Sequence, residues 1–226
     1  MNLITSFFKL LVFVFLLSLC LPIYGQTFTP IQEPEVDVNW RLGNRWAMNA
    51  SFATSHQLDE NYAFRQVEIS HNTSYEIGFY SKLSLGFINR WRNTFNNDRK
   101  DETIIVGQYA HAKKYNRIKL AHRFQSQVRL RESLTINRNR YRISAELPLT
   151  GRRVDLKEFF VIGSTEALWS LSEKRRPEIS QRFSVDLGYK ISSAVQAIIG
   201  SQFRFDNYNI GVSRTLLINS GIVISI

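Results

Sequence analysis

The sequence predicts an all-β protein, an exported antiparallel up-and-down transmembrane β-barrel of about 10–12 strands. Three observations predict it: an apolar segment at the N-terminus, an alternation of apolar and polar residues that recurs almost to the C-terminus, and polar connections between the alternating segments. They divide the chain into a signal peptide at residues 1–25, an N-terminal leader at 26–35 and a barrel domain at 36–226.

The N-terminal segment has the features of a secretory signal peptide. Apolar residues run from Phe7 to Leu17 around the single charge of Lys9, and the small Gly25 suits signal peptidase. The run is shorter than the about 20 residues of a spanning helix, and an uncleaved anchor is the alternative. Cys20 follows a bulky residue, which disfavours lipidation, and cleavage after Gly25 leaves no cysteine. We therefore expect export through the Sec pathway and no disulfide bond.

The chain is basic, with 29 Lys and Arg against 19 Asp and Glu and a formal net charge of +10. A basic excess suits nucleic acid, anionic lipid headgroups or anionic solutes. Because an exported chain rarely meets nucleic acid, the expected partners are outer-membrane lipid, lipopolysaccharide and a small anionic solute, with no nucleic acid. The expected location is the cell outer membrane, and the sequence leaves the oligomeric state open.

Segment 117–131 shows the alternation most clearly. One face carries Ile118, Leu120, Phe124, Val128 and Leu130, and the other carries Lys119, Arg123, Gln125, Gln127, Arg129 and Arg131. Segments 140–147, 178–189 and 195–205 alternate in the same way. Several of these runs exceed about ten residues, which is long for a globular strand and sufficient to cross a bilayer at a tilt.

About ten strands are expected, with residues 36–42 as a further candidate. They lie near residues 45–53, 62–79, 82–91, 102–113, 117–131, 135–149, 153–163, 178–190, 194–205 and 208–226. Connections are expected to be short near 43–44, 81–82, 114–116, 150–152 and 190–193, and longer near 54–61, 92–101, 132–136 and 163–177. Such asymmetry is typical of outer-membrane barrels, whose periplasmic turns are short. Within the last connection, residues 164–174 predict a short helix that stops before Pro177.

Several short segments, in this order, resemble a family of exported bacteroidete β-barrel proteins known as domain of unknown function 2490. The resembling segments are Leu42–Trp46, Leu120–Gln125, Arg129–Arg131, Arg140–Arg142, Leu147–Leu149, Glu158–Phe160, Gln181–Phe183 and Leu187–Ser192. The resemblance spans most of the mature chain and implies an outer-membrane barrel. It supplies no activity, cofactor or catalytic residue. The chain ends on Ile226, where such barrels often end on an aromatic residue.

The charged face of the strands carries the candidate site. If lipid covers the apolar face, the charged face lines the lumen, and the candidate lumen or anion-binding residues are Arg123, Arg129, Arg131, Arg140, Arg142, Arg182, Arg204, Glu146 and Glu158. Arginine pairs with carboxylate in two-point contacts, so one interpretation is a lumen plugged by salt bridges. The other is an arginine-lined site or small pore for an anionic solute, in which the carboxylates orient the guanidinium groups.

Catalysis is not expected, because a lipid hydrolase needs a serine activated by a histidine that a third group orients. The histidines are His56, His71, His111 and His122, and their spacing fits no metal motif. We therefore expect neither a metal nor a cofactor. A soluble periplasmic lipocalin-like barrel with its apolar face inward fits the same alternation. That barrel and an outer-membrane lipid hydrolase are the alternatives to a structural, solute-binding or small-pore role.

Overall fold

The computed structural model describes residues 29–58, 62–92, 100–173 and 175–226, and the expected signal peptide lies outside these ranges. Eleven strands form within them, in agreement with the expected number. Their bounds are β1 (Thr29–Arg41), β2 (Trp46–Gln57), β3 (Phe64–Glu76), β4 (Ser81–Trp91), β5 (Glu102–Tyr115), β6 (Ile118–Arg131), β7 (Leu134–Pro148), β8 (Phe159–Ser172), β9 (Arg175–Lys190), β10 (Val195–Asp206) and β11 (Ser213–Ser225). None of the described segments forms a helix long and apolar enough to cross a membrane.

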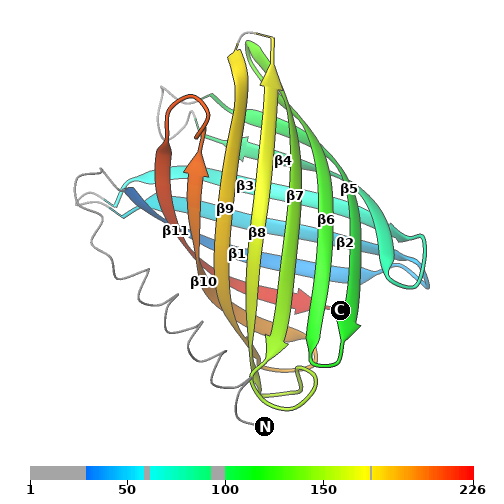
Figure 1. Ribbon diagram of the computed structural model, residues 1–226. Coiled ribbons are helices and arrows are strands. Elements are labelled where there is room, and N and C mark those ends of the chain that lie inside the picture. The colour runs from blue at the N-terminus through cyan, green and yellow to red at the C-terminus, as the bar shows by residue number, and fades with distance from the viewer. Residues whose placement is uncertain (1–28, 59–61, 93–99, 174) are drawn as a thin grey trace.

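The strands close into one barrel, in which each strand pairs with its neighbours in sequence and β1 pairs with β11. The sequential pairs are antiparallel, as expected, whereas β1 and β11 are parallel. An up-and-down chain with an odd number of strands must close in this way, because its first and last strands point in the same direction. Both strands begin at one rim, here called the N-terminal rim, and end at the other, the C-terminal rim. Front and back strands cross steeply in Figure 1, which reflects their tilt in the barrel wall.

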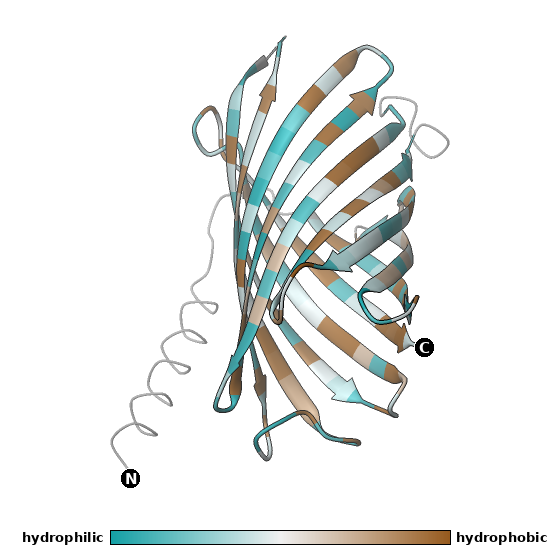
Figure 2. Ribbon diagram, turned by 90° about the vertical axis from the view of Figure 1, so that its right-hand side faces the viewer, coloured by the Kyte–Doolittle hydropathy of each residue, from teal (hydrophilic) through white to brown (hydrophobic). Residues whose placement is uncertain are grey.

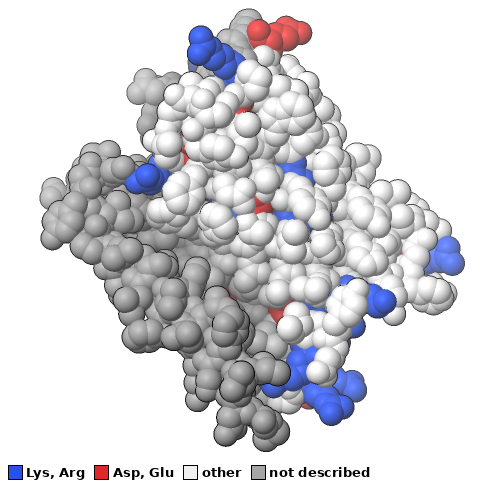
Figure 3. Space-filling view, viewed as in Figure 1, with Lys and Arg blue, Asp and Glu red and all other residues white. Residues whose placement is uncertain are grey.

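Most apolar side chains point out of the barrel and most polar side chains point into the lumen, which also holds buried apolar groups such as Ile104 and Leu168. On β6, Phe124 is 48% exposed, whereas Gln127 and Arg129 on the opposite face are 3% and 4% exposed. Figure 2 shows the alternation along the strands, and in Figure 3 the outer face is mostly uncharged, with Lys and Arg gathered toward its edges. This orientation contradicts the lipocalin-like alternative, which requires the apolar face inside. An apolar outer wall is what lipid requires of spanning strands.

Strand β8 corrects the short helix expected at residues 164–174. It pairs along its length with β7 and β9, and the long connection expected at 163–177 is a tight hairpin between β8 and β9. Glu166, Ala167 and Leu168 favour helices intrinsically, but the segment also alternates with period two. Pairing on both edges outweighs the helical preference, because strand formation depends mainly on context.

The connections are less regular than expected. At the C-terminal rim, where short turns are expected, the connection from β7 to β8 runs from 149 to 158, and at the N-terminal rim the β6–β7 connection is only 132–133. Strand β1 begins at Thr29, inside the segment expected as a leader, and its ladder with β2 is interrupted at Glu33 and Pro34. Proline has no N–H to donate to a ladder, so the sequence of this stretch does not predict a strand.

Phe160 fills the lumen near the C-terminal rim by lying against Gly188. Phe160 is 2% exposed, and a Cβ added to Gly188 would overlap its ring. We expect Gly188→Val to lower the free energy of unfolding by ~1–3 kcal/mol through overpacking. Gly163→Val, on the outer face with open space around it, is the matched control and should change little. The midpoint of heat-induced change in gel mobility measures both, and equal midpoints would contradict this packing.

Candidate functional site

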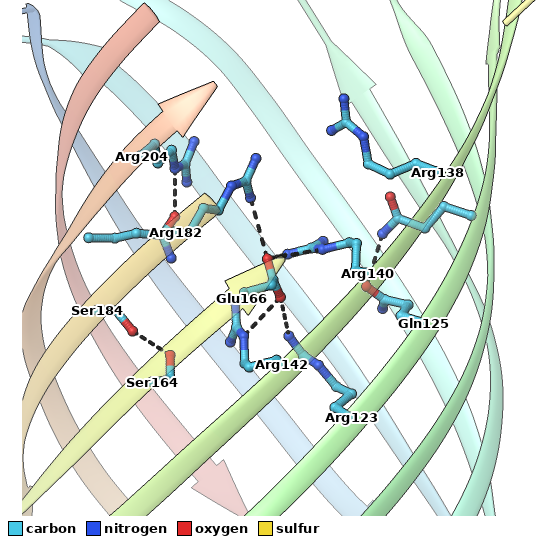
Figure 4. Close-up of polar contacts among 12 residues, drawn as sticks. Arg123, Gln125, Arg138, Arg140, Arg142, Ser164, Glu166, Arg182, Ser184 and Arg204 are labelled. Carbon is cyan, nitrogen blue, oxygen red and sulfur yellow. Dashed lines mark hydrogen bonds and ion pairs between the residues drawn. The ribbon is translucent and has the colours of Figure 1, made fainter. Parts of the chain in front are cut away.

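One buried carboxylate in the lumen gathers four arginines. Glu166 of β8 is 2% exposed. Arg140 donates to its Oε1 from Nη2 (2.6 Å) and Nε (3.1 Å), and Arg142 donates from Nε to Oε2 (2.9 Å). Arg123 Nη2 lies 3.4 Å from Oε2, and Arg182 Nη1 lies 3.7 Å from Oε1. These five residues, called the Glu166 cluster, converge from four strands in Figure 4.

The register of adjacent strands assembles the Glu166 cluster. Arg123 of β6 is opposite Arg142 of β7, Arg142 is opposite Glu166, and Glu166 is opposite Arg182 of β9. Arg182 is in turn opposite Arg204 of β10. Residues in one such row point to the same face, and like charges placed opposite one another repel. Glu166 in the middle of the row offsets that repulsion.

A second cluster lies toward the N-terminal rim. The side chain of Glu102, the first residue of β5, is 0% exposed. Its Oε2 accepts from Arg129 Nη2 (2.6 Å) and Arg90 Nη1 (3.1 Å), and its Oε1 accepts from Arg131 Nε (2.8 Å). Arg92 Nη1 lies 3.8 Å from Oε2. These five residues form the Glu102 cluster, which repeats the arrangement of four arginines around one glutamate.

This wall of the lumen keeps guanidinium groups in excess of carboxylates. Arg138 of β7 donates from Nε to Ser170 Oγ (2.7 Å), and no carboxylate in the described part of the chain pairs with it. The Nε groups of Arg129 and Arg182 are buried without a hydrogen-bond partner among the described residues. Buried donors are normally satisfied by protein, water or a ligand. These two Nε groups are covered by protein, and the guanidinium groups that an anion in the lumen can reach include those of the partly exposed Arg123 and Arg142.

The opposite wall is acidic. In the strand order of the barrel, β1 lies across the lumen from β6 and β7. Its inward face carries Glu33, Glu35 and Asp37. Glu33 Oε2 lies 3.7 Å from Arg204 Nη2, and Asp37 Oδ1 accepts from Asn49 Nδ2 (3.2 Å). A cationic and an acidic wall thus face each other.

Side chains of both walls retain contact with solvent. Glu35 is exposed, and Arg123 and Arg142 keep 32% and 27% of their side-chain surface exposed. A lumen filled tightly by salt bridges would cover these groups. The described barrel therefore contains solvent-accessible space beside the Glu166 cluster.

A family model described as "Protein of unknown function (DUF2490)" matches residues 34–214. The chain belongs to this family. Among curated proteins there is no match. The expected membership of the DUF2490 family is thus confirmed.

The DUF2490 barrel is similar to solved outer-membrane barrels at low identity. They include the loop L8 deletion mutant of OmpT, an outer membrane protein of Vibrio cholerae (9% identity, TM-score 0.42, 72% of this chain and 57% of that chain). OmpT of Vibrio cholerae expressed in the outer membrane matches with 9% identity and TM-score 0.41 over 71% of this chain and 54% of that one. The siderophore receptor PirA from Pseudomonas aeruginosa matches with 12% identity and TM-score 0.30 over 76% and 33%. The chain spans little more than half the length of the two Vibrio barrels.

The DUF2490 barrel places most of the predicted lumen residues on one wall and separates two. Arg123, Arg140, Arg142 and Arg182 lie in the Glu166 cluster, Arg129 and Arg131 lie in the Glu102 cluster, and Arg204 lies beside Glu33. Glu146 instead pairs with Lys119 (3.4 Å) closer to the C-terminal rim. Glu158 lies in the β7–β8 connection, where it accepts the backbone N–H of Asp155 (3.1 Å). Their role as anion ligands stays a prediction.

Sequence reasoning missed the two glutamates that organise the lumen. Glu166 lies in the segment where a helix is expected, and Glu102 is the first residue of its strand. It also missed Arg90, Arg92 and Arg138. The sequence does hold a signal for Glu166. Ser164 and Ser170 are separated from it by even numbers of residues, which is the spacing of polar side chains on one face of a strand.

A serine and a histidine do meet, but on the outer face. Ser81 Oγ lies 2.9 Å from His111 Nδ1 and 3.2 Å from Tyr109 Oη. Among the described residues no side chain forms a hydrogen bond with the other ring nitrogen of His111, which is where a triad would have its orienting group. In the described ranges no three His, Cys, Asp or Glu side chains gather as a metal site.

Proposed function

We propose that this protein sits in the bacterial outer membrane, reached by Sec export, and that its lumen binds and passes small anions. The observation that carries the proposal is the sharing of each buried glutamate by four arginines, which leaves positive charge on one wall. The apolar outer face supports the membrane location.

The carboxylates act as supports rather than as competing ligands. Glu166 holds Arg140 and Arg142 by short hydrogen bonds, so their guanidinium groups are ordered before a solute arrives. Ordered cationic groups lose little side-chain entropy when they bind an anion. The acidic row on β1 produces a transverse field that holds the anion against the arginine wall. A barrel of eleven strands is too narrow for a general porin, which favours small solutes.

Conductance in planar bilayers tests the proposal. We expect the wild-type protein to give small channels whose reversal potential in a potassium chloride gradient indicates chloride preference. Arg138→Gln removes a cationic group that has no carboxylate partner among the described residues, so it should lower the chloride-to-potassium permeability ratio roughly twofold without breaking an ion pair.

Arg45→Gln is the control for surface charge. Arg45 lies in the exposed β1–β2 turn and contacts Tyr75 rather than the lumen (3.4 Å), so the ratio should stay unchanged. Cation preference in the wild type, or the absence of channels, would refute the proposal.

A further inference from the structure

The outer face carries a groove that the lumen does not explain. It crosses β2 to β6, has a volume of about 940 Å³ and is lined almost wholly by apolar groups. This volume lies within the range of small-molecule sites. The groove opens outward, because most of its lining residues share the outward parity of their strands, and only Ser84, Gly86 and Gln108 of the lining have the inward parity.

Three neighbouring rows of paired residues create the groove. Its middle row is Thr73, Leu85, Gly107 and Ser126, which are opposite one another on β3 to β6. Leu85 projects outward (66% exposed), and the low part of the row is at the small residues Gly107 and Ser126. The row on the side of the C-terminal rim consists of larger groups, Trp46, Tyr75, Leu83, Tyr109 and Phe124. The row on the other side contains His71, Phe87 and Ile105. A Cβ at Gly107 would meet nothing within 4 Å, so the groove is open there.

Polar groups lie beside the groove, one row closer to the C-terminal rim than the row of Tyr109 and Phe124. Ser81, His111 and His122 are opposite one another on β4, β5 and β6. His122 Nδ1 lies 2.9 Å from Tyr141 Oη. Lys113 Nζ lies 5.5 Å from the ring centroid of Tyr80 and 5.3 Å from that of Tyr115. Hydrogen-bond donors and a cation therefore lie at the side of the groove that is nearer the membrane surface.

We propose that this outer groove binds an anionic phospholipid, with one acyl chain over Gly107 and Ser126 and the phosphate beside His111, His122 and Lys113. The donors and the cation lie beyond the row of Tyr109 and Phe124, on the C-terminal-rim side of the groove. An apolar groove with such groups beside it matches an acyl chain whose phosphate lies beyond that aromatic row. The inference rests on the proposed membrane location and not on the anion-binding lumen.

Native mass spectrometry of the full protein from detergent micelles tests the site, with phosphatidylglycerol and phosphatidylcholine as the probes. The wild type is expected to retain one phosphatidylglycerol in preference to phosphatidylcholine. Gly107→Leu fills the groove, so retention should fall at least ~5-fold. Gly163→Leu, also on the outer face with open space around it, is the matched control and should retain the lipid.

Further variants separate the headgroup from the chain. Lys113→Gln combined with His122→Gln should abolish the preference for phosphatidylglycerol while phosphatidylcholine retention stays the same. Heat-modifiable gel mobility verifies that each variant has folded, and unchanged conductance of Gly107→Leu separates this site from the lumen. Equal retention by Gly107→Leu and Gly163→Leu would overturn the proposal. Lysophospholipid formed by the wild type but not by Ser81→Ala would also overturn it, in favour of hydrolysis.

Discussion

Replacing Glu166 by glutamine is expected to lower the free energy of unfolding by ~3–5 kcal/mol. The change removes the single carboxylate shared by Arg123, Arg140, Arg142 and Arg182, which then repel one another around a neutral amide. Glutamine has nearly the same size as glutamate, so no cavity forms and the effect is electrostatic. Urea-induced unfolding from lipid vesicles, followed by tryptophan fluorescence, measures it.

Glu146→Gln is the matched control for that variant. Glu146 pairs with Lys119 alone among the described residues, and the two side chains are 28% and 50% exposed. Partly exposed pairs contribute only ~0–1 kcal/mol, so this variant should unfold close to the wild type. If Glu166→Gln and Glu146→Gln lower the free energy of unfolding equally, Glu166 does not organise the lumen as described.

Ala167→Arg is expected to be the most damaging small-to-charged substitution on the outer face. Ala167 is exposed near the middle of β8 and points away from the lumen. An arginine at the midplane of the bilayer costs ~2–4 kcal/mol, and the cost falls to ~0–1 kcal/mol near the interface. The free energy of unfolding from vesicles should therefore fall by an amount that depends on how deep in the bilayer the arginine lies.

Ala197→Arg provides the comparison at the edge of the membrane. Ala197 is on the outer face too, but only two residues from the start of β10 at the C-terminal rim. It should cost far less than Ala167→Arg. Similar costs at both positions would mean that lipid does not surround the middle of the barrel.

The sequence predicts the barrel well because its alternation is regular over long strands. The pattern of β6 assigns Arg123, Arg129 and Arg131 to one face, and the structure places all three in the lumen. Alternation alone does not say which face is inside. That step depends on closure of eleven strands, which involves residues far apart in the chain.

The organising glutamates are harder to predict for a different reason. Glu166 sits among residues with high helix propensity, and only pairing with β7 and β9 makes the segment a strand. The four arginines around it come from three other strands, so their convergence is a matter of register rather than spacing. The prolines of β1 make this strand hard to predict from the sequence. The acidic wall of Glu33, Glu35 and Asp37 is hard to predict for the same reason.

Spin labels on single cysteines at three consecutive positions of β9 test the central claim most directly. Phe183 and Val185 are 48% and 41% exposed on the outer face, and Ser184 between them donates or accepts a hydrogen bond with Ser164 (2.7 Å) in the lumen. In lipid vesicles, labels at 183 and 185 should collide with oxygen dissolved in the bilayer, whereas the label at 184 should collide with a water-soluble nickel complex. The reverse pattern, or equal access of the nickel complex to all three positions, would contradict a lipid-facing apolar wall around a polar lumen.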